Sequence, residues 1–75
     1  FLAAAEEPRI SQLTKRRREV LERLLMGDSE KQIAFRCNVA RATIHDHVLA
    51  IYRHFDVSSR GELLALFIGR AKPNL

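Results

Sequence analysis

The chain has 75 residues, of which 47% are hydrophobic, so it suffices for one small domain with a modest core. Thirteen Lys and Arg against nine Asp and Glu give a net charge of +4, which favours a polyanionic partner. No apolar run reaches 18 residues, which excludes a membrane-spanning helix. A single cysteine, Cys37, excludes an intrachain disulfide and fits a reducing, cytoplasmic compartment.

Residues 1–12 show no helical apolar period and contain Glu6-Glu7-Pro8, so we expect a linker or flexible N-terminal tail there. The first residue is not Met, which suggests a fragment of a longer chain. A folded domain is expected over residues 13–70, followed by a C-terminal tail over residues 71–75.

The first helix is expected over residues 15–26, with the Thr14 hydroxyl as its N-cap. Gly27 can adopt the left-handed conformation that ends a helix. The apolar residues at helical spacing, which predict a buried stripe, are Val20, Leu21, Leu24 and Leu25.

The second helix is expected over residues 30–37, because Ser29 and Gln32 form a capping-box pattern. Its inner face is predicted to contain Ile33, Ala34 and Cys37. Asn38 tolerates the left-handed conformation and can close the helix. The short turn that follows is what a helix-turn-helix requires.

The third helix is expected over residues 41–55 and has two contrasting faces. The residues at i, i+4, i+7 and i+11, which predict a buried face, are Ile44, Val48, Ile51 and Phe55. At about 100° per residue, the other side carries small and polar residues. These residues are Ala42, His45, Asp46, Leu49 and Arg53. Such a helix can pack on a core with one side and enter a DNA groove with the other.

A fourth helix is expected over residues 60–70, where Ser59 and Glu62 form a second capping-box pattern. The fold class is therefore all-α, with four helices. The fourth helix is apolar nearly all round, and a spare apolar face suggests a partner surface. We expect part of Leu64, Phe67 and Ile68 to lie at a dimer contact.

Many residues agree in order and spacing with one family. They are Leu13-Thr14, Glu19-Val20-Leu21, Gly27, Ser29, Lys31, Ile33-Ala34, Val39, Thr43-Ile44, His47-Val48, Val57, Ser59-Arg60 and Glu62-Leu63. With this pattern, residues 13–68 resemble the LuxR/GerE-type helix-turn-helix. This is the DNA-binding domain of quorum-sensing regulators and of NarL/FixJ-type response regulators.

The resemblance implies the C-terminal output domain of a bacterial transcriptional regulator. Such a domain binds double-stranded DNA as a homodimer, with the third helix in the major groove and the fourth at the dimer contact. RNA polymerase is a further candidate partner, and neither a cofactor nor a metal is expected.

Residue by residue, the resemblance assigns base reading to His45, Asp46 and Leu49. It assigns phosphate contact, or support of such contacts, to Lys31, Thr43, His47 and Arg60. From helix geometry and charge we add Ala42 to the base-contacting set, and Arg41 and Arg53 to the phosphate-contacting set.

The chain departs from the family pattern at several positions. Lys15 and Arg17 replace the usual Pro and Glu, which creates the run Lys15–Arg18 at a helix N-terminus. This run is either a solvated face or an added surface for phosphate or a partner. Ala40 replaces a capping residue, at a cost of about 1 kcal/mol.

Base reading is the least typical part of the pattern. His45 replaces a common Lys, and its imidazole can donate to guanine. Asp46 can accept from cytosine N4 but would repel phosphate. The preferred DNA sequence therefore does not transfer from the family.

Two other functions stay open: a σ-factor-like promoter-reading domain, and a protein-interaction module with a helix-turn-helix shape. An enzyme is disfavoured, because neither a nucleophile elbow nor a glycine-rich loop is present. His45 and His47 would lie about 200° apart around a helix, which disfavours a shared metal.

Overall fold

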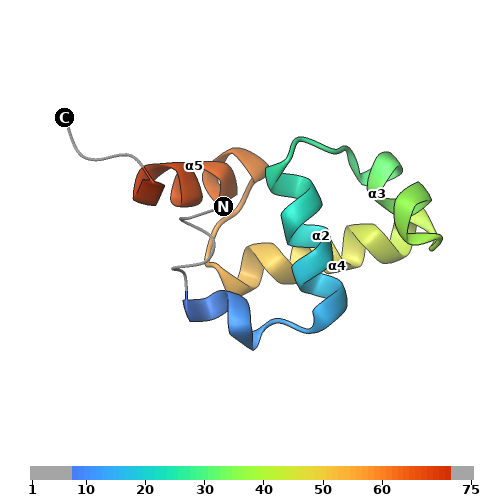
Figure 1. The fold of residues 1–75 in the computed structure, drawn as a ribbon, viewed down its shortest axis with the longest axis horizontal. Coiled ribbons are helices and arrows are strands. Elements are labelled where there is room, and N and C mark those ends of the chain that lie inside the picture. The colour runs from blue at the N-terminus through green and yellow to red at the C-terminus, as the bar shows by residue number, and fades with distance from the viewer. Residues whose placement is uncertain (1–7, 72–75) are drawn as a thin grey trace.

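The structure is a computed structural model that describes residues 8–71, and it contains no strand in that range. A short 3₁₀ helix, η1 (Pro8–Gln12), precedes four α-helices, as Figure 1 shows. They are α2 (Lys15–Leu25), α3 (Glu30–Cys37), α4 (Arg41–His54) and α5 (Arg60–Ala71). The predicted all-α, four-helix class is confirmed, and each helix end lies within one residue of its expected position.

The starts of α2 and α3 are fixed by the side chains that the sequence predicted. The Thr14 hydroxyl accepts from the Arg17 N–H at 3.2 Å. Ser29 and Gln32 form the full capping box, with bonds of 3.1 and 2.8 Å. Ala40, before α4, provides no side-chain cap, as expected. Helix α4 therefore begins with backbone bonds alone, from Thr43 and Ile44 N–H to the Ala40 carbonyl.

Three residues with positive φ set the turns between helices. Gly27 (φ 99°) follows α2, and Asn38 (φ 56°, ψ 46°) closes α3 in the left-handed conformation. Both were predicted. Asp56 (φ 56°) plays the same role after α4 and was not predicted. Because Asn38 turns the chain so sharply, only three residues separate the end of α3 from the start of α4. This pair of helices is the helix-turn-helix.

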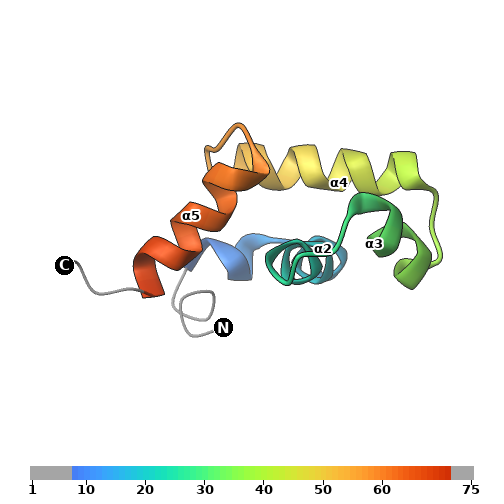
Figure 2. The same cartoon turned by 90° about the horizontal axis from the view of Figure 1, so that it is seen from above.

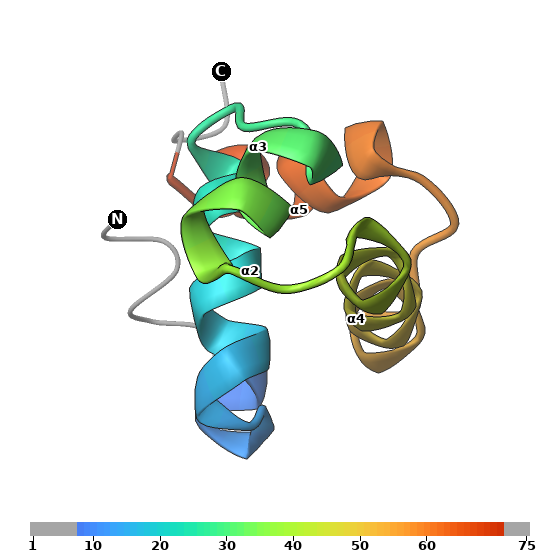
Figure 3. The same ribbon diagram turned by 90° about the vertical axis from the view of Figure 1, so that its right-hand side faces the viewer.

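One apolar core joins all four α-helices. Its buried members are Leu13, Val20, Leu21, Leu24, Ile33, Ala34, Ile44, Val48, Ile51, Phe55, Leu63 and Phe67. The whole predicted buried face of α4 is included. Figures 2 and 3 show that α2 and α3 lie on one side of α4, and that α5 follows near the C-terminal end of α4. Helix α4 therefore forms an edge of the molecule. The opposite side of α4 has no described helix over it.

Residues 8–12 differ from the expected linker because they form η1 and dock on the end of α4. Ile10 packs against the core. The Arg9 guanidinium lies 5.1 Å from the centre of the Phe55 ring and donates to the Phe55 carbonyl at 3.5 Å. His54 Nε2 lies 2.7 Å from the Arg9 carbonyl. The rest of the expected tails, residues 1–7 and 72–75, lies outside the described residues.

The start of α5 also differs from its predicted capping box. The Glu62 N–H donates to the Ser59 hydroxyl at 3.2 Å, as expected. The Glu62 carboxylate, however, accepts from the N–H and hydroxyl of Ser58 rather than from the Ser59 N–H. These hydrogen bonds from Ser58 lower the pKa of Glu62. The acidic side chain therefore ties the loop before α5 to its first turn.

Candidate nucleic-acid interface

Helix α4 presents an exposed stripe on the side away from the core. We call it the outward stripe; it consists of Ala42, Asp46, Leu49 and Arg53, at i, i+4, i+7 and i+11. All four residues are exposed. The buried stripe, Ile44, Val48, Ile51 and Phe55, lies opposite and is at most 2% exposed. Because no described helix covers that side of α4 (Figure 2), the outward stripe is accessible to a large partner.

His45 lies at one flank of the outward stripe and is held by α3. Its Nδ1 atom lies 3.0 and 3.3 Å from the two carboxylate oxygens of Glu30, the first residue of α3. The His45 side chain is 54% exposed, and that of Glu30 is 29% exposed. Tyr52 lies half-buried on the same flank, and burial raises the pKa of its hydroxyl.

The candidate phosphate-contacting residues fall into two groups. Lys31, Arg41, Thr43 and Arg53 are exposed, and the first three lie at the N-terminal ends of α3 and α4. His47 is half-buried, and its Nδ1 atom is buried without a hydrogen-bond partner among the described residues. Lys31, Arg41 and Thr43 form a basic border at the N-terminal ends of α3 and α4, whereas Arg53 belongs to the outward stripe itself.

Arg60 differs from the other phosphate candidates because its guanidinium is used within the fold. It donates to the Leu24 carbonyl at 2.6 Å, across 36 positions of sequence. The Leu24 carbonyl lies in the last turn of α2 and also accepts from the Gly27 N–H at 3.1 Å. In this structure Arg60 therefore joins the start of α5 to the end of α2.

The three residues predicted at a dimer contact do not lie together. Phe67 is only 5% exposed and packs edge-on against Phe55, with ring centroids 5.5 Å apart. It fills the core, and its side chain does not face a partner. Leu64 is half-buried, whereas Ile68 is 53% exposed. Of the three residues predicted at a dimer contact, Leu64 and Ile68 remain as candidates for an outer apolar face on α5.

The basic run Lys15–Arg18 is partly used for local contacts. Arg18 donates to the Leu13 carbonyl at 2.8 Å, and Arg16 lies 3.7 Å from Glu19. Arg17 is half-buried. Arg16 and Arg18 are therefore partly engaged in contacts within and just before α2.

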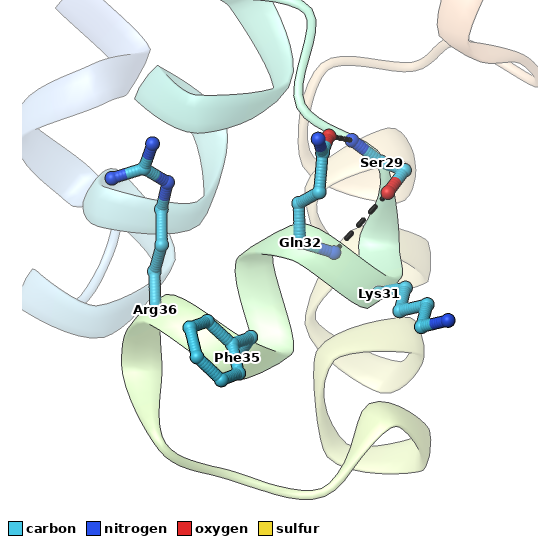
Figure 4. A pocket seen from close by; sticks show the side chains of 5 residues that line it. All are labelled: Ser29, Lys31, Gln32, Phe35 and Arg36. Carbon is cyan, nitrogen blue, oxygen red and sulfur yellow. Dashed lines mark hydrogen bonds between the residues drawn. The ribbon is translucent and has the colours of Figure 1, made fainter.

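One exposed feature was missed by sequence reasoning. Phe35, on the outer side of α3, is 88% exposed. It lines a shallow hollow with Ser29, Lys31, Gln32 and Arg36, as Figure 4 shows. Arg36 is paired with Asp28 at 3.3 Å. The sequence signal was present, because Phe35 falls outside the predicted inner face of the helix over residues 30–37.

Metal-ligand clusters and membrane-spanning helices are two further kinds of feature to consider among residues 8–71. No group of three His, Cys, Asp or Glu side chains in that range is placed to hold a metal ion. No helix there is long and apolar enough to cross a membrane. The exposed outward stripe, its basic border and the tight α3–α4 turn instead define a helix-turn-helix domain of the kind that reads DNA.

Comparisons with known proteins place the chain in a family. The model of the bacterial regulatory proteins of the luxR family matches residues 11–67. The chain therefore belongs to the luxR family of bacterial regulatory proteins, as its sequence pattern predicted. The family and its relatives support transcription regulation by DNA binding. The comparison with solved structures gave no significant match.

Three curated relatives are similar to the chain. A glycerol metabolism activator of Pseudomonas putida is 44% identical over 48 residues, which are 64% of this chain and 22% of the relative. The nitrate/nitrite response regulator protein NarP of Escherichia coli is 39% identical over 64 residues, 85% of this chain and 30% of the relative. The putative HTH-type transcriptional regulator YhjB of Escherichia coli is 33% identical over 51 residues, 68% and 26% respectively.

The chain thus spans between 22% and 30% of the length of these relatives. What is similar is one domain, and it corresponds to the helix-turn-helix described above.

Proposed function

We propose that this chain is the sequence-specific DNA-binding output domain of a bacterial transcriptional regulator, acting in the cytoplasm. Helix α4 enters the major groove, where base edges are contacted by Ala42, His45, Asp46 and Leu49. The observation that carries this proposal is the arrangement of α4, which buries one stripe completely and exposes the opposite one along its whole length. Regulators as different as the glycerol and nitrate/nitrite relatives match this same domain.

Phosphate contacts would come from the exposed basic and hydroxyl residues at the start of the two helices. Lys31, Arg41 and Thr43 border the groove-facing end of α4, and Arg53 lies at its far end. Helix N-termini also carry partial positive charge, which favours phosphate there. These contacts would fix the register of α4, whereas the base-edge contacts would supply sequence preference.

Asp46 gives the interface an unusual character. A carboxylate in the outward stripe repels phosphate and can only accept hydrogen bonds, so it suits a base that offers a donor, such as cytosine through N4. Arg53, on the same stripe, offsets its charge. This combination supports selective binding over strong general affinity for DNA.

A dimer on DNA would use the outer side of α5. Leu64 and Ile68 lie there, while Phe67 completes the core. One short helix buries less area than a standard interface, so we expect dimerisation on a two-half-site duplex and a monomer in its absence. Sedimentation with and without that duplex checks this expectation; a monomer in both states would count against the dimer.

The proposed function is tested by binding to DNA selected from a random pool. We expect the selected duplex to bind at least tenfold more tightly than random DNA, and its affinity to fall steeply as salt is raised. Lys31→Gln should lower the salt slope by about one unit without changing the sequence preference. Lys15→Gln, a matched charge change in the basic run, should leave the slope unchanged.

Equal affinity for selected and random duplexes would sink this proposal. That result, combined with an undisturbed fold, would instead favour a helix-turn-helix-shaped interaction module.

A further inference from the structure

A hydrogen bond links the two helices of the helix-turn-helix at the flank of the outward stripe. Glu30, the first residue of α3, accepts from His45 on α4, with Nδ1–oxygen separations of 3.0 and 3.3 Å. Both oxygens of the carboxylate are therefore within reach of the same ring nitrogen. The His45 side chain keeps 54% of its surface exposed, so the rest of the ring stays available to a partner.

This contact determines which ring nitrogen carries the proton. An ionised carboxylate has no hydrogen to give, so the Nδ1 atom must be the donor. In a neutral imidazole the other nitrogen, Nε2, then presents a lone pair. Nδ1 and Nε2 lie on different edges of the ring, and the edge that carries Nδ1 is occupied by Glu30. In the neutral form of His45, the nitrogen that Glu30 leaves available to DNA is thus a hydrogen-bond acceptor.

We propose that Glu30 is a positioning residue for sequence recognition, because it fixes neutral His45 as an acceptor in the major groove. This inference rests on the proposed function. The base that meets His45, on the strand nearer to it, would then offer a donor: adenine through N6 or cytosine through N4. Guanine, which presents only the acceptors N7 and O6 there, is disfavoured. This reverses the expectation from sequence, in which His45 donates to guanine.

The neighbouring chemistry supports the same preference. Asp46, the next residue, is exposed and accepts only, so two consecutive positions of α4 offer acceptors to the groove. The common lysine at the position of His45 would offer only donors. The pairing with Glu30 therefore makes this position a hydrogen-bond acceptor instead of a donor.

The test is the base preference of the chain and three variants, selected from random duplexes at pH 8.5. An alkaline buffer is used because the inference concerns the neutral imidazole. The wild-type chain should prefer adenine or cytosine over guanine by about tenfold at one half-site position. His45→Ala should remove the preference at that position and no other.

Glu30→Gln is the decisive variant. An amide can donate to Nδ1 as well as accept from it, so Nε2 is no longer held as an acceptor. We expect discrimination against guanine to fall by about tenfold at that position alone. Glu22→Gln, the same charge change on an exposed residue of α2, should leave the profile unchanged. Loss of fold would weaken all duplexes together and would not alter the profile at one position.

A selected site whose profile is unchanged in Glu30→Gln would overturn this inference alone. A wild-type preference for guanine that disappears in His45→Ala would overturn it as well. A chain that selects no site would overturn the proposed function, and this inference with it.

Discussion

The two faces of α4 are built on one backbone yet follow different rules. Residues of the buried stripe are all large and apolar, and each touches neighbours from other helices. The outward stripe contains one small, one acidic, one apolar and one basic residue: Ala42, Asp46, Leu49 and Arg53. All four are exposed, so burial in the core does not restrict their chemistry. The comparison teaches that stability and recognition are separable within this helix. Substitutions on one face should leave the other property almost unchanged.

The largest effect is expected from a cavity in the buried stripe. Ile51 is fully buried, so Ile51→Ala should lower the free energy of unfolding by about 2–5 kcal/mol. Leu49→Ala, the matched truncation on the outward stripe, should change it by at most about 0.5 kcal/mol. Urea unfolding followed by circular dichroism measures both.

If Ile51→Ala has no cooperative transition, Ile51→Val supplies the number, with an expected loss of about 0.5–1.5 kcal/mol. Equal losses for the two alanine variants would break the proposed separation of the faces.

A smaller effect is expected at the start of α4, which lacks a side-chain cap. Ala40→Ser adds a hydroxyl that can accept from the second or third N–H of the helix, and we expect a gain of about 1 kcal/mol. Ala42→Ser makes the same chemical change inside the helix and should give no gain. Thermal unfolding of both variants is the measurement. A gain for Ala42→Ser, or a loss for Ala40→Ser, would contradict the capping argument.

The smallest effect on stability is expected outside both faces of α4, at the start of α5. Hydrogen bonds from Ser58 hold the pKa of Glu62 below its usual range. A carboxyl group whose pKa is lower in the folded state stabilises the fold above its unfolded pKa. That contribution is lost as the pH falls through the folded pKa. We therefore expect Glu62→Gln to lower the melting temperature slightly at pH 7 and to match the wild type at pH 2–3.

Melting temperatures of both proteins at the two pH values check this. A difference that persists unchanged in acid would show that the Ser58 contacts do not act through the charge of Glu62.

Local rules were sufficient for most of the fold. Capping by Thr14 and Ser29, closure at Asn38 and the spacing of the buried stripe are all decided within a few residues of sequence, and the structure confirms them. The fourth helix was harder. Because residues 63–68 are all apolar, no periodicity separated inward Phe67 from outward Ile68.

The contacts that could not be predicted from the sequence join residues far apart in the chain. Arg60 reaches the Leu24 carbonyl across 36 positions, and His45 reaches Glu30 across 15. No helix was predicted over residues 8–12, because a five-residue 3₁₀ helix is too short to show a helical period. Which residues of α4 are exposed was therefore predictable from the sequence, while the contact between His45 and Glu30 was not.

The central claim is that the outward stripe of α4 is the surface that meets DNA. Its most direct test is to follow the backbone amide signals of the ¹⁵N-labelled chain by NMR as a selected duplex is added. The account predicts that the largest shift changes fall at the N-terminal ends of α3 and α4 and along the outward stripe, with small changes across α2. Largest changes on α2, with α4 unaffected, would contradict it.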